Sequence, residues 1–147
     1  MHRVVIDTNL YIDWLNAGRH ADLLFQPDAV KYLSAVVMME LYAGARTRPD
    51  RRLVESVVGP FAKSNRLLVP TVVMYKEAGF LLSKLLHRPA GPTGRHASLS
   101  HDILIALSAR AIGATVITQN TRDFSAIQRL RSFRLQMVGN AYAFDSG

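Results

Sequence analysis

The sequence contains no cysteine among its 147 residues. This absence excludes disulfides, thiolate zinc sites and cysteine nucleophiles, so any bound metal must be held by oxygen or imidazole ligands. Long apolar runs are also missing. The N-terminal segment MHRVVIDTN has too short an apolar run for a signal peptide, and no stretch approaches the roughly 18 apolar residues that span a bilayer. We therefore expect a cytoplasmic protein with no membrane segment.

Acidic residues are outnumbered, with 11 Asp and Glu against 18 Lys and Arg, which gives a net charge of +7. Polyanions such as nucleic acids become candidate partners, although many soluble proteins are basic without such a partner. The hydrophobic content of 49% is enough for one good core at this length. The composition predicts a single domain over residues 1–147.

Short apolar segments alternate with helical ones along the chain. We expect strands at residues 4–6, 32–37, 114–118 and 134–138, with a further short apolar segment at 66–69. Helices are expected at 8–16, at 38–45, from Pro49 with an interruption near Pro60, at 71–87, from Ser98 or Ser100 to 112, and as a short turn at 125–130. Residues 88–98, rich in Pro, Gly and basic residues, read as an exposed loop. The alternation predicts an α/β fold with a mainly parallel sheet.

Two aspartates stand where helices are expected to begin. Asp7 follows the first apolar strand, at the end of a parallel strand where functional groups collect. Asp102 lies in what we expect to be the first turn of the apolar helix SHDILIALSARAIG. Each also has an ordinary structural explanation, since Asp7 could simply cap a helix and Asp102 could simply favour a helix dipole.

Glu40 is less easily explained by structure alone. It follows VVMM and precedes LYAG, so a carboxylate lies in a segment that otherwise belongs to a core. Burying an unpaired charge is costly, and such a group needs a cation or hydrogen-bond donors. The alternative is a glutamate on a polar helix face.

The turn in VITQNTRDF adds Asn120 and Asp123, either of which could merely shape the turn or cap the following helix. As a group, however, the acids fall at strand-to-helix junctions and would repel one another without a counterion. Mg²⁺ prefers oxygen ligands and commonly uses one or two carboxylates together with substrate phosphate. The pattern therefore favours a magnesium site suited to phosphoryl chemistry.

Three stretches carry a family resemblance: VVIDTNLYID, SAVVMMELYAG and LSHDILIALSARAIGATVITQNTRDF. Together, in this order, they resemble the PIN-domain family, and especially the VapC-type toxins of toxin–antitoxin pairs. The resemblance covers nearly the whole chain. It implies a three-layer α/β sandwich in which helices flank a mainly parallel five-stranded sheet.

The resemblance also implies a site and a function. Asp7, Glu40 and Asp102 match the family's regular acidic positions and would bind Mg²⁺ or Mn²⁺, with Asp123 as the fourth catalytic and metal-binding acid. The side chains that would support these ligands or add one are Thr8, Asn9, Thr118 and Asn120. The implied activity is that of a metal-dependent endoribonuclease. Such toxins are inhibited by a small antitoxin and are commonly homodimers.

The fourth acidic position departs from the family pattern. Where the family often has an acid directly after the fourth strand, this chain divides the position between Asn120 and Asp123. Which of the two completes the metal site stays open. His101 also stands where a small polar residue or Asn is more usual, and its ordinary role is at the surface or as a cap.

The expected mechanism uses a bound metal to lower the pKa of a water and to stabilise the charge that develops on the phosphate. Asp7 would be the central ligand, and Glu40 or Asp102 could accept a proton from the water. Basic residues should surround the acids and contact phosphates. The candidates are Arg46, Arg48, Arg88, Arg95, His96 and Arg122. Tyr11, Trp14 and Tyr42 could stack on bases, although aromatic residues in such helices more often belong to the core or a dimer contact.

Three alternatives to a nuclease share part of this pattern. A PIN-like fold without catalysis could serve as an RNA- or protein-binding module. A phosphatase would need a second Asp two residues after Asp7, where the chain has Asn9, and a receiver domain would need a late lysine, whereas no lysine follows Lys84.

Overall fold

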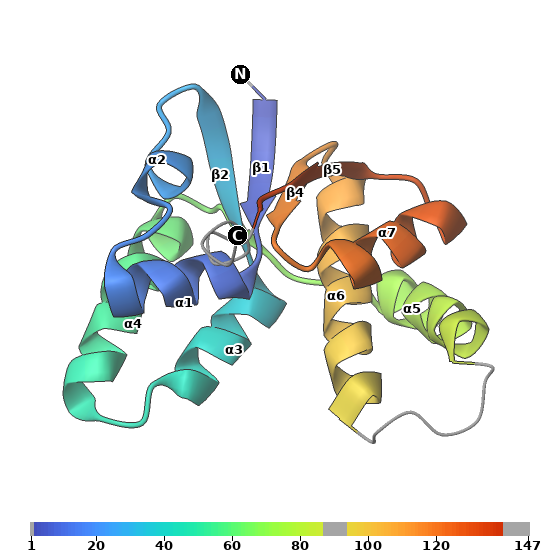
Figure 1. The fold of residues 1–147 in the computed structure, drawn as a ribbon, viewed down its shortest axis with the longest axis horizontal. Helices are drawn as coiled ribbons and strands as arrows, with labels where there is room; N and C mark the ends of the chain where they lie inside the picture. The colour runs from blue at the N-terminus through green and yellow to red at the C-terminus, as the bar shows by residue number, and fades with distance from the viewer. Residues whose placement is uncertain (1, 87–93, 140–147) are drawn as a thin grey trace, which may run out of the picture.

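The computed structural model describes residues 2–86 and 94–139. The described residues form five strands and seven helices (Figure 1). Their order is β1 (His2–Ile6), α1 (Thr8–Ala17), α2 (Ala21–Leu24), β2 (Ala29–Ser34), α3 (Ala35–Gly44), α4 (Arg48–Lys63), β3 (Leu67–Leu68), α5 (Val72–Leu85), α6 (Gly94–Ala111), β4 (Thr115–Thr118), α7 (Thr121–Leu130) and β5 (Arg134–Met137).

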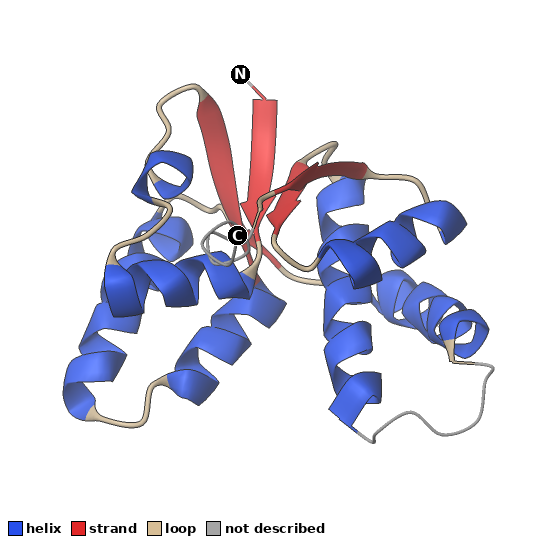
Figure 2. Ribbon diagram, viewed as in Figure 1, coloured by secondary structure: helices blue, strands red, loops and turns tan. Residues whose placement is uncertain are grey.

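The sheet has the strand order β3-β2-β1-β4-β5, and every pair of neighbours is parallel. The predicted α/β fold with a five-stranded parallel sheet is confirmed. Helices α1 to α4 gather on one side of the strands and α5 to α7 on the other (Figure 2). The chain leaves β1 toward β2 and returns later to β4, so the strand order reverses beside β1. Ligand sites of open parallel sheets lie at such a reversal.

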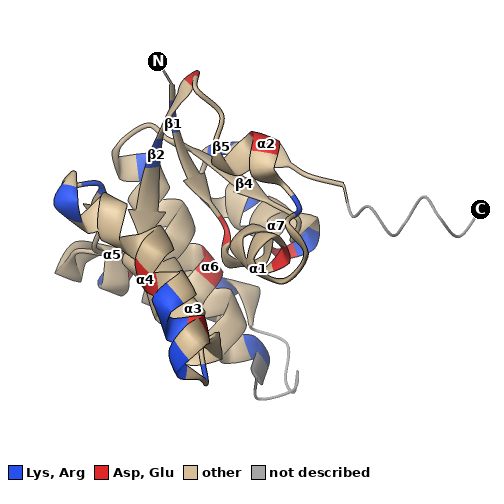
Figure 3. Ribbon diagram, turned by 90° about the vertical axis from the view of Figure 1, so that its left-hand side faces the viewer, with Lys and Arg blue, Asp and Glu red and all other residues tan. Residues whose placement is uncertain are grey.

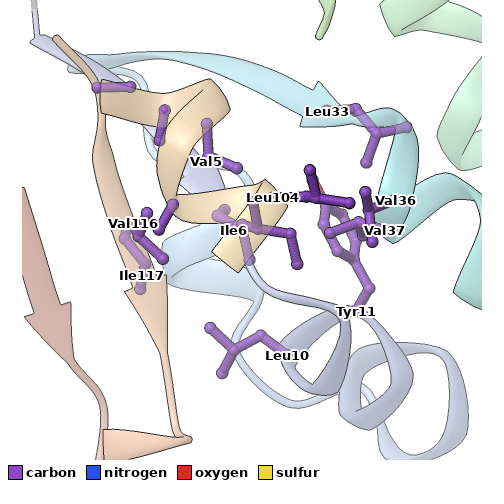
Figure 4. Close-up of a cluster of buried hydrophobic side chains, with 14 of the residues drawn as sticks. Val5, Ile6, Leu10, Tyr11, Leu33, Val36, Val37, Leu104, Val116 and Ile117 are labelled. Atoms are coloured by element: carbon purple, nitrogen blue, oxygen red, sulfur yellow. The ribbon is translucent and has the colours of Figure 1, made fainter. Parts of the chain in front are cut away.

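The core surrounds the central strands. Val5 and Val116 are completely buried, and Ile6 is 1% exposed. Figure 4 shows side chains from α1, α3 and α6 packed around these strands. Apolar burial of this kind stabilises the fold by about 25 cal/mol per Å² removed from water. The packing fixes the positions of the helices that carry the polar residues described below.

Two predicted boundaries in the first half of the chain are wrong. The second strand ends at Ser34, so Val36 and Val37 belong to α3. Ser34 caps that helix by accepting a hydrogen bond from Val36 N over 3.1 Å. Helix α4 is not interrupted near Pro60 and continues to Lys63. A proline removes one helical hydrogen bond, and here that loss falls near the end of the helix, on an exposed position.

The helix that carries Asp102 begins earlier than predicted. It starts at Gly94, so the predicted caps at Ser98 and Ser100 are wrong, and residues 94–98 are helical rather than loop. Residues 87–93 lie outside the described part of the chain. The predicted end at Gly113 is confirmed by a left-handed φ of 66°, which glycine adopts readily. Asp102 therefore lies in the middle of α6, two turns from its beginning.

The last predicted helical turn is also longer than expected. Helix α7 begins at Thr121 rather than at residue 125, and Asn120 is its N-cap. In the part of the chain that the structure describes, no helix combines the length and apolar character needed to cross a membrane.

Candidate metal centre

Parallel strands end at the same edge of the sheet, and this edge collects the acids. Asp7 directly follows β1, and Thr118 is the last residue of the neighbouring β4. Helix α3 begins at the end of β2 and carries Glu40, while α6 carries Asp102 past the same edge. Figure 3 shows acidic residues on α3, on α6 and in the segment between β1 and α1, with Lys and Arg on α4.

Asp7 is held by hydrogen bonds to both oxygens. Its Oδ1 accepts from Thr8 N over 2.8 Å, and its Oδ2 accepts from Thr118 Oγ1 over 2.7 Å. The side chain is 5% exposed. Burial raises the pKa of Asp7, the charge of Glu40 raises it further, and the bonds from Thr118 and Thr8 oppose the shift. Asp7 thus caps α1, as the structural explanation required, and also lies within the acidic cluster.

The pKa of Asp102 is raised both by burial and by three neighbouring acids. Burial, followed by the charges of Asp7, Asp123 and Glu40 in that order of effect, raises its pKa to about 8. A hydrogen bond from Asn120 Nδ2 to Asp102 Oδ2, 3.0 Å long, acts in the opposite direction. Because Asp102 lies mid-helix, its explanation as a residue that favours the helix dipole is wrong.

Glu40 is more accessible than its apolar neighbours predict. Its side chain is 33% exposed, so the expectation of a buried carboxylate is wrong. Thr8 Oγ1 donates to Glu40 Oε1 over 2.8 Å. His101 Nδ1 lies 3.7 Å from Glu40 Oε2, so the histidine faces this acid as well as preceding Asp102. In the sequence, His101 is only adjacent to Asp102. The contact of His101 with Glu40 could not be predicted, because it depends on how α3 and α6 pack.

Asn120 and Asp123 both face the cluster. Asn120 Oδ1 accepts from Asp123 N at 3.4 Å, as a helix cap, while its Nδ2 contacts Asp102 and, at 3.3 Å, Asp123 Oδ2. Asp123 is 9% exposed. Its Oδ1 is buried and meets Arg95 through a 3.3 Å ion-pair contact rather than through a well-directed hydrogen bond. Asn120 therefore acts as a bridge between two carboxylates.

The supporting side chains named from the sequence are placed in three ways. Thr8 joins Glu40, and Thr118 joins Asp7 while accepting from Asn120 N over 2.9 Å. Asn9 is different, because its Oδ1 is buried and has no hydrogen-bond partner in the described residues. With Asn120, three of the four supporting side chains are thus tied to acids of the cluster.

The predicted phosphate contacts vary in position. Four of these side chains are exposed: Arg46 lies on the segment joining α3 to α4, Arg48 begins α4, Arg122 lies on α7 and His96 on α6. Arg95 instead pairs with Asp123. Arg88 lies outside the described residues.

The aromatic candidates belong mainly to the interior. Tyr11 is 4% exposed, so the prediction that it could stack on a base is wrong. Trp14 packs edge-on against Phe25, with ring centroids 5.3 Å apart, and both Trp14 and Tyr42 are partly buried against the core.

The donor set fits a hard divalent cation, although the ligand shell is not closed. In residues 2–86 and 94–139, no three His, Asp or Glu side chains are arranged to hold one ion as they stand. The charge of Glu40 nevertheless raises the pKa of Asp7, and the charges of Asp7, Asp123 and Glu40 raise the pKa of Asp102, so negative charge is in excess in a buried place. Carboxylate oxygens are the ligands that Mg²⁺ and Mn²⁺ prefer.

Known proteins were compared with the sequence and with the structure. The family model described as PIN domain matches residues 4–130. No curated protein matches the sequence. A structure of VapBC from Salmonella typhimurium bound to DNA is similar at 24% identity and a TM-score of 0.62, covering 93% of this chain and 98% of that chain.

Two further solved structures agree. VapBC2 from Rickettsia felis, bound to a promoter DNA fragment, is similar at 20% identity and a TM-score of 0.62, with 92% and 98% of the two chains covered. VapBC-5 from Mycobacterium tuberculosis, described as a member of a toxin–antitoxin family, is similar at 21% identity and a TM-score of 0.61, with 94% and 100% covered. These likenesses establish the fold, and the family model spans most of the chain. The protein belongs to the PIN domain family.

Proposed function

We propose that this protein is a metal-dependent endoribonuclease and the VapC-like toxin of a type II toxin–antitoxin pair, acting in the cytoplasm. The observation that carries the proposal is the gathering of four acids at one edge of the sheet, where burial and the charges of Asp7, Asp123 and Glu40 raise the pKa of Asp102 to about 8. Strongly perturbed carboxylates at the switch point of a parallel sheet are candidates for function rather than for stability. Membership of the PIN family supports a nuclease.

The metal-binding residues in this proposal are Asp7 and Asp102, joined by Glu40 and Asp123. The first two are the most buried of the acids, at 5% and 7% exposed, and lie on elements fixed by the core. Mg²⁺ or Mn²⁺ held there supplies Lewis-acid stabilisation of the charge on the scissile phosphate and promotes ionisation of a water.

The chain's own side chains orient the acids. Thr118 fixes Asp7 Oδ2, and Asn120 keeps Asp102 and Asp123 at hydrogen-bond distance from a single amide. Glu40 is the most accessible of the four acids; Thr8 donates to its Oε1, and His101 Nδ1 lies 3.7 Å from its Oε2. We assign to Glu40 Oε2 the role of accepting a proton from the attacking water.

The proposed RNA contacts are the exposed arginines Arg46, Arg48 and Arg122, with Arg95 closest to the acids. Arg95 already neutralises Asp123, so a cation at the centre would free its guanidinium for a phosphate of the substrate. Contacts of this type give affinity without choice of sequence.

The proposed protein partners are an antitoxin and a second copy of the chain. VapBC complexes are among the similar structures, which supports the antitoxin. Helix α5 exposes Val72, Val73, Tyr75 and Phe80, each at least 57% exposed, and exposed apolar groups in such number mark an interaction surface. We assign this face to a homodimer contact. Size-exclusion chromatography with light scattering should show a dimer for the wild type and a monomer for Tyr75→Lys.

The enzymatic proposal is tested by incubating purified protein with RNA in EDTA, in Mg²⁺ and in Mn²⁺. We expect cleavage only with a metal, and a loss of about 100-fold or more in Asp7→Asn and Asp102→Asn, as is usual when a catalytic metal ligand is lost. Asp28→Asn, which changes an exposed aspartate outside the cluster, is the matched control and should cleave like the wild type. Growth arrest on expression, relieved by the protein of a neighbouring gene, tests the toxin assignment separately.

A further inference from the structure

A second polar cluster lies outside the acidic centre and joins three segments. Asp13 comes from α1, His20 from the turn before α2, and Gln119 from the segment between β4 and α7. Asp13 Oδ2 lies 3.1 Å from His20 Nε2 and 3.3 Å from Gln119 Nε2, and the two nitrogens are 3.1 Å apart. With the imidazole protonated at Nε2, both nitrogens donate to the same carboxylate oxygen. We call these three residues the turn cluster.

His20 is held firmly in place. Its side chain is 12% exposed, and its backbone adopts a left-handed conformation with φ 64°. The preceding turn folds back on α1, because Gly18 N donates to the carbonyls of Asp13 and Trp14. A residue other than glycine in this conformation is uncommon, and it persists where the surroundings determine it. Here the turn brings the imidazole against Asp13.

Gln119 links the turn cluster to the acids. Its neighbours in the chain, Thr118 and Asn120, contact the acidic centre directly. Thr118 donates to Asp7, and Asn120 donates to Asp102 and Asp123. The side-chain amide of Gln119 instead contacts Asp13 and His20. The segment is thus attached on one side to three acids and on the other to the turn cluster.

We propose that Asp13 and His20 are positioning residues for the metal centre: through Gln119 they fix the segment that carries Thr118 and Asn120, and so set the geometry of three acids. This inference rests on the proposed function, because the centre must bind a metal for its geometry to matter. Groups that hold metal ligands in place typically change metal affinity by 10- to 100-fold when removed. Asp13 and His20 act on the ligands only through Gln119, so we expect their removal to change metal affinity by about tenfold, the lower end of this range.

The variants separate the side chain of His20 from its backbone. His20→Asn keeps a residue that tolerates the left-handed conformation, but its shorter amide does not reach Asp13. His20→Gln places an amide N–H near the position of Nε2 and should restore the contact. Gln119→Ala removes the link itself. Asn65→Ala is the control, because Asn65 is exposed and also left-handed, with φ 57°, in the turn between α4 and β3.

Mn²⁺ affinity is measured by calorimetry and RNA cleavage by steady-state kinetics. We expect His20→Asn and Gln119→Ala to weaken Mn²⁺ binding about tenfold and to lower kcat, with the KM for RNA unchanged. His20→Gln should recover most of the affinity. Asn65→Ala should lower Tm while leaving Mn²⁺ affinity as in the wild type.

The outcomes distinguish the two proposals. Wild-type Mn²⁺ affinity in both His20→Asn and Gln119→Ala would overturn the positioning role, as would a His20→Gln variant no better than His20→Asn. If the wild type binds Mn²⁺ but cleaves no RNA, the proposed function fails while the affinities still decide the positioning role. If the wild type binds no Mn²⁺, both proposals are overturned.

Discussion

Asn120 Nδ2 lies 3.0 Å from Asp102 Oδ2, and among the described residues this hydrogen bond is the contact that lowers the pKa of Asp102 against burial and three neighbouring acids. The same nitrogen is 3.3 Å from Asp123 Oδ2. A neutral amide therefore stands between two carboxylates, where an acid would add to their repulsion. This arrangement gives a physical role to the residue that occupies the divided fourth position.

Removing that amide should impair metal binding in a pH-dependent way. In Asn120→Ala, the pKa of Asp102 should rise above about 8, because the opposing hydrogen bond is lost. A proton then competes more strongly with the metal, and Mn²⁺ affinity at pH 7 should fall about tenfold. The deficit should shrink at pH 9.5, and calorimetric titrations at the two pH values measure it. An equal deficit at both values would show that the amide acts only through packing.

The metal-free protein should lose stability as the pH rises toward 8. The folded-state pKa of Asp102 is raised to about 8 from an ordinary value of 3.8, so the folded state binds more protons than the unfolded state between these pH values. The contribution of Asp102 to the free energy of unfolding is therefore fully present below its unfolded-state pKa of 3.8. It is lost as the pH rises to the folded-state pKa of about 8.

Asp102→Asn tests that sign, since it removes the ionisable group. Between pH 6 and pH 9 the wild type should lose about 2 kcal/mol more than the variant, or roughly 5 °C in Tm, when both are measured in EDTA. Asp28→Asn is the control and should follow the wild type, because Asp28 is exposed. Parallel curves for wild type and Asp102→Asn would contradict a raised pKa.

Metal addition should stabilise the fold through the acidic centre. At a Mn²⁺ concentration of 100 Kd the gain is about 2.7 kcal/mol, which EDTA should reverse. Asp7→Asn should show almost none of this gain, because Asp7 lies at the end of the central strand in the proposed shell. Thermal melts with and without the metal measure it, and an undiminished gain in Asp7→Asn would place the ion elsewhere.

Thr118→Val should lower both stability and metal affinity, although valine has nearly the same shape as threonine. Its Oγ1 donates to Asp7 and accepts from Asn120 N, and the side chain is fully buried. Thr118→Val leaves both partners unsatisfied, which should cost about 2 kcal/mol of stability and reduce Mn²⁺ affinity. Thr115→Val, in the same strand, is the matched control. Denaturant unfolding and metal titration of the two variants should differ clearly, and equal behaviour would remove Thr118 from the site.

The centre of the sheet could be predicted from the sequence because β1 and β4 carry short runs of buried, β-branched residues. Helix boundaries were harder. Ser34 was hidden inside an apolar run, and α6 begins in a stretch rich in glycine and basic residues that suggested a loop. Local composition does not report the tertiary packing that extends a helix.

The positions of the acids in the sequence predicted the cluster, but they did not predict how exposed each acid is. The apolar neighbours of Glu40 suggested burial, yet its side chain is one-third exposed, whereas Asp102 is 7% exposed. Exposure depends on how α3 and α6 face one another, which a single helix cannot show. The contacts of His101 with Glu40 and of Gln119 with Asp13 join segments far apart in the chain, so no spacing predicted them.

We propose above all that the acidic centre hydrolyses RNA with a bound metal. The most direct measurement follows the cleavage of one RNA across a Mg²⁺ titration that begins in EDTA, with wild type and Asp7→Asn side by side. We predict no cleavage in EDTA, a rate that rises and saturates with Mg²⁺ for the wild type, and almost none for Asp7→Asn at any concentration. Cleavage in EDTA that survives Asp7→Asn would contradict the account, and a wild type that binds Mg²⁺ without cutting RNA would identify a binding module instead.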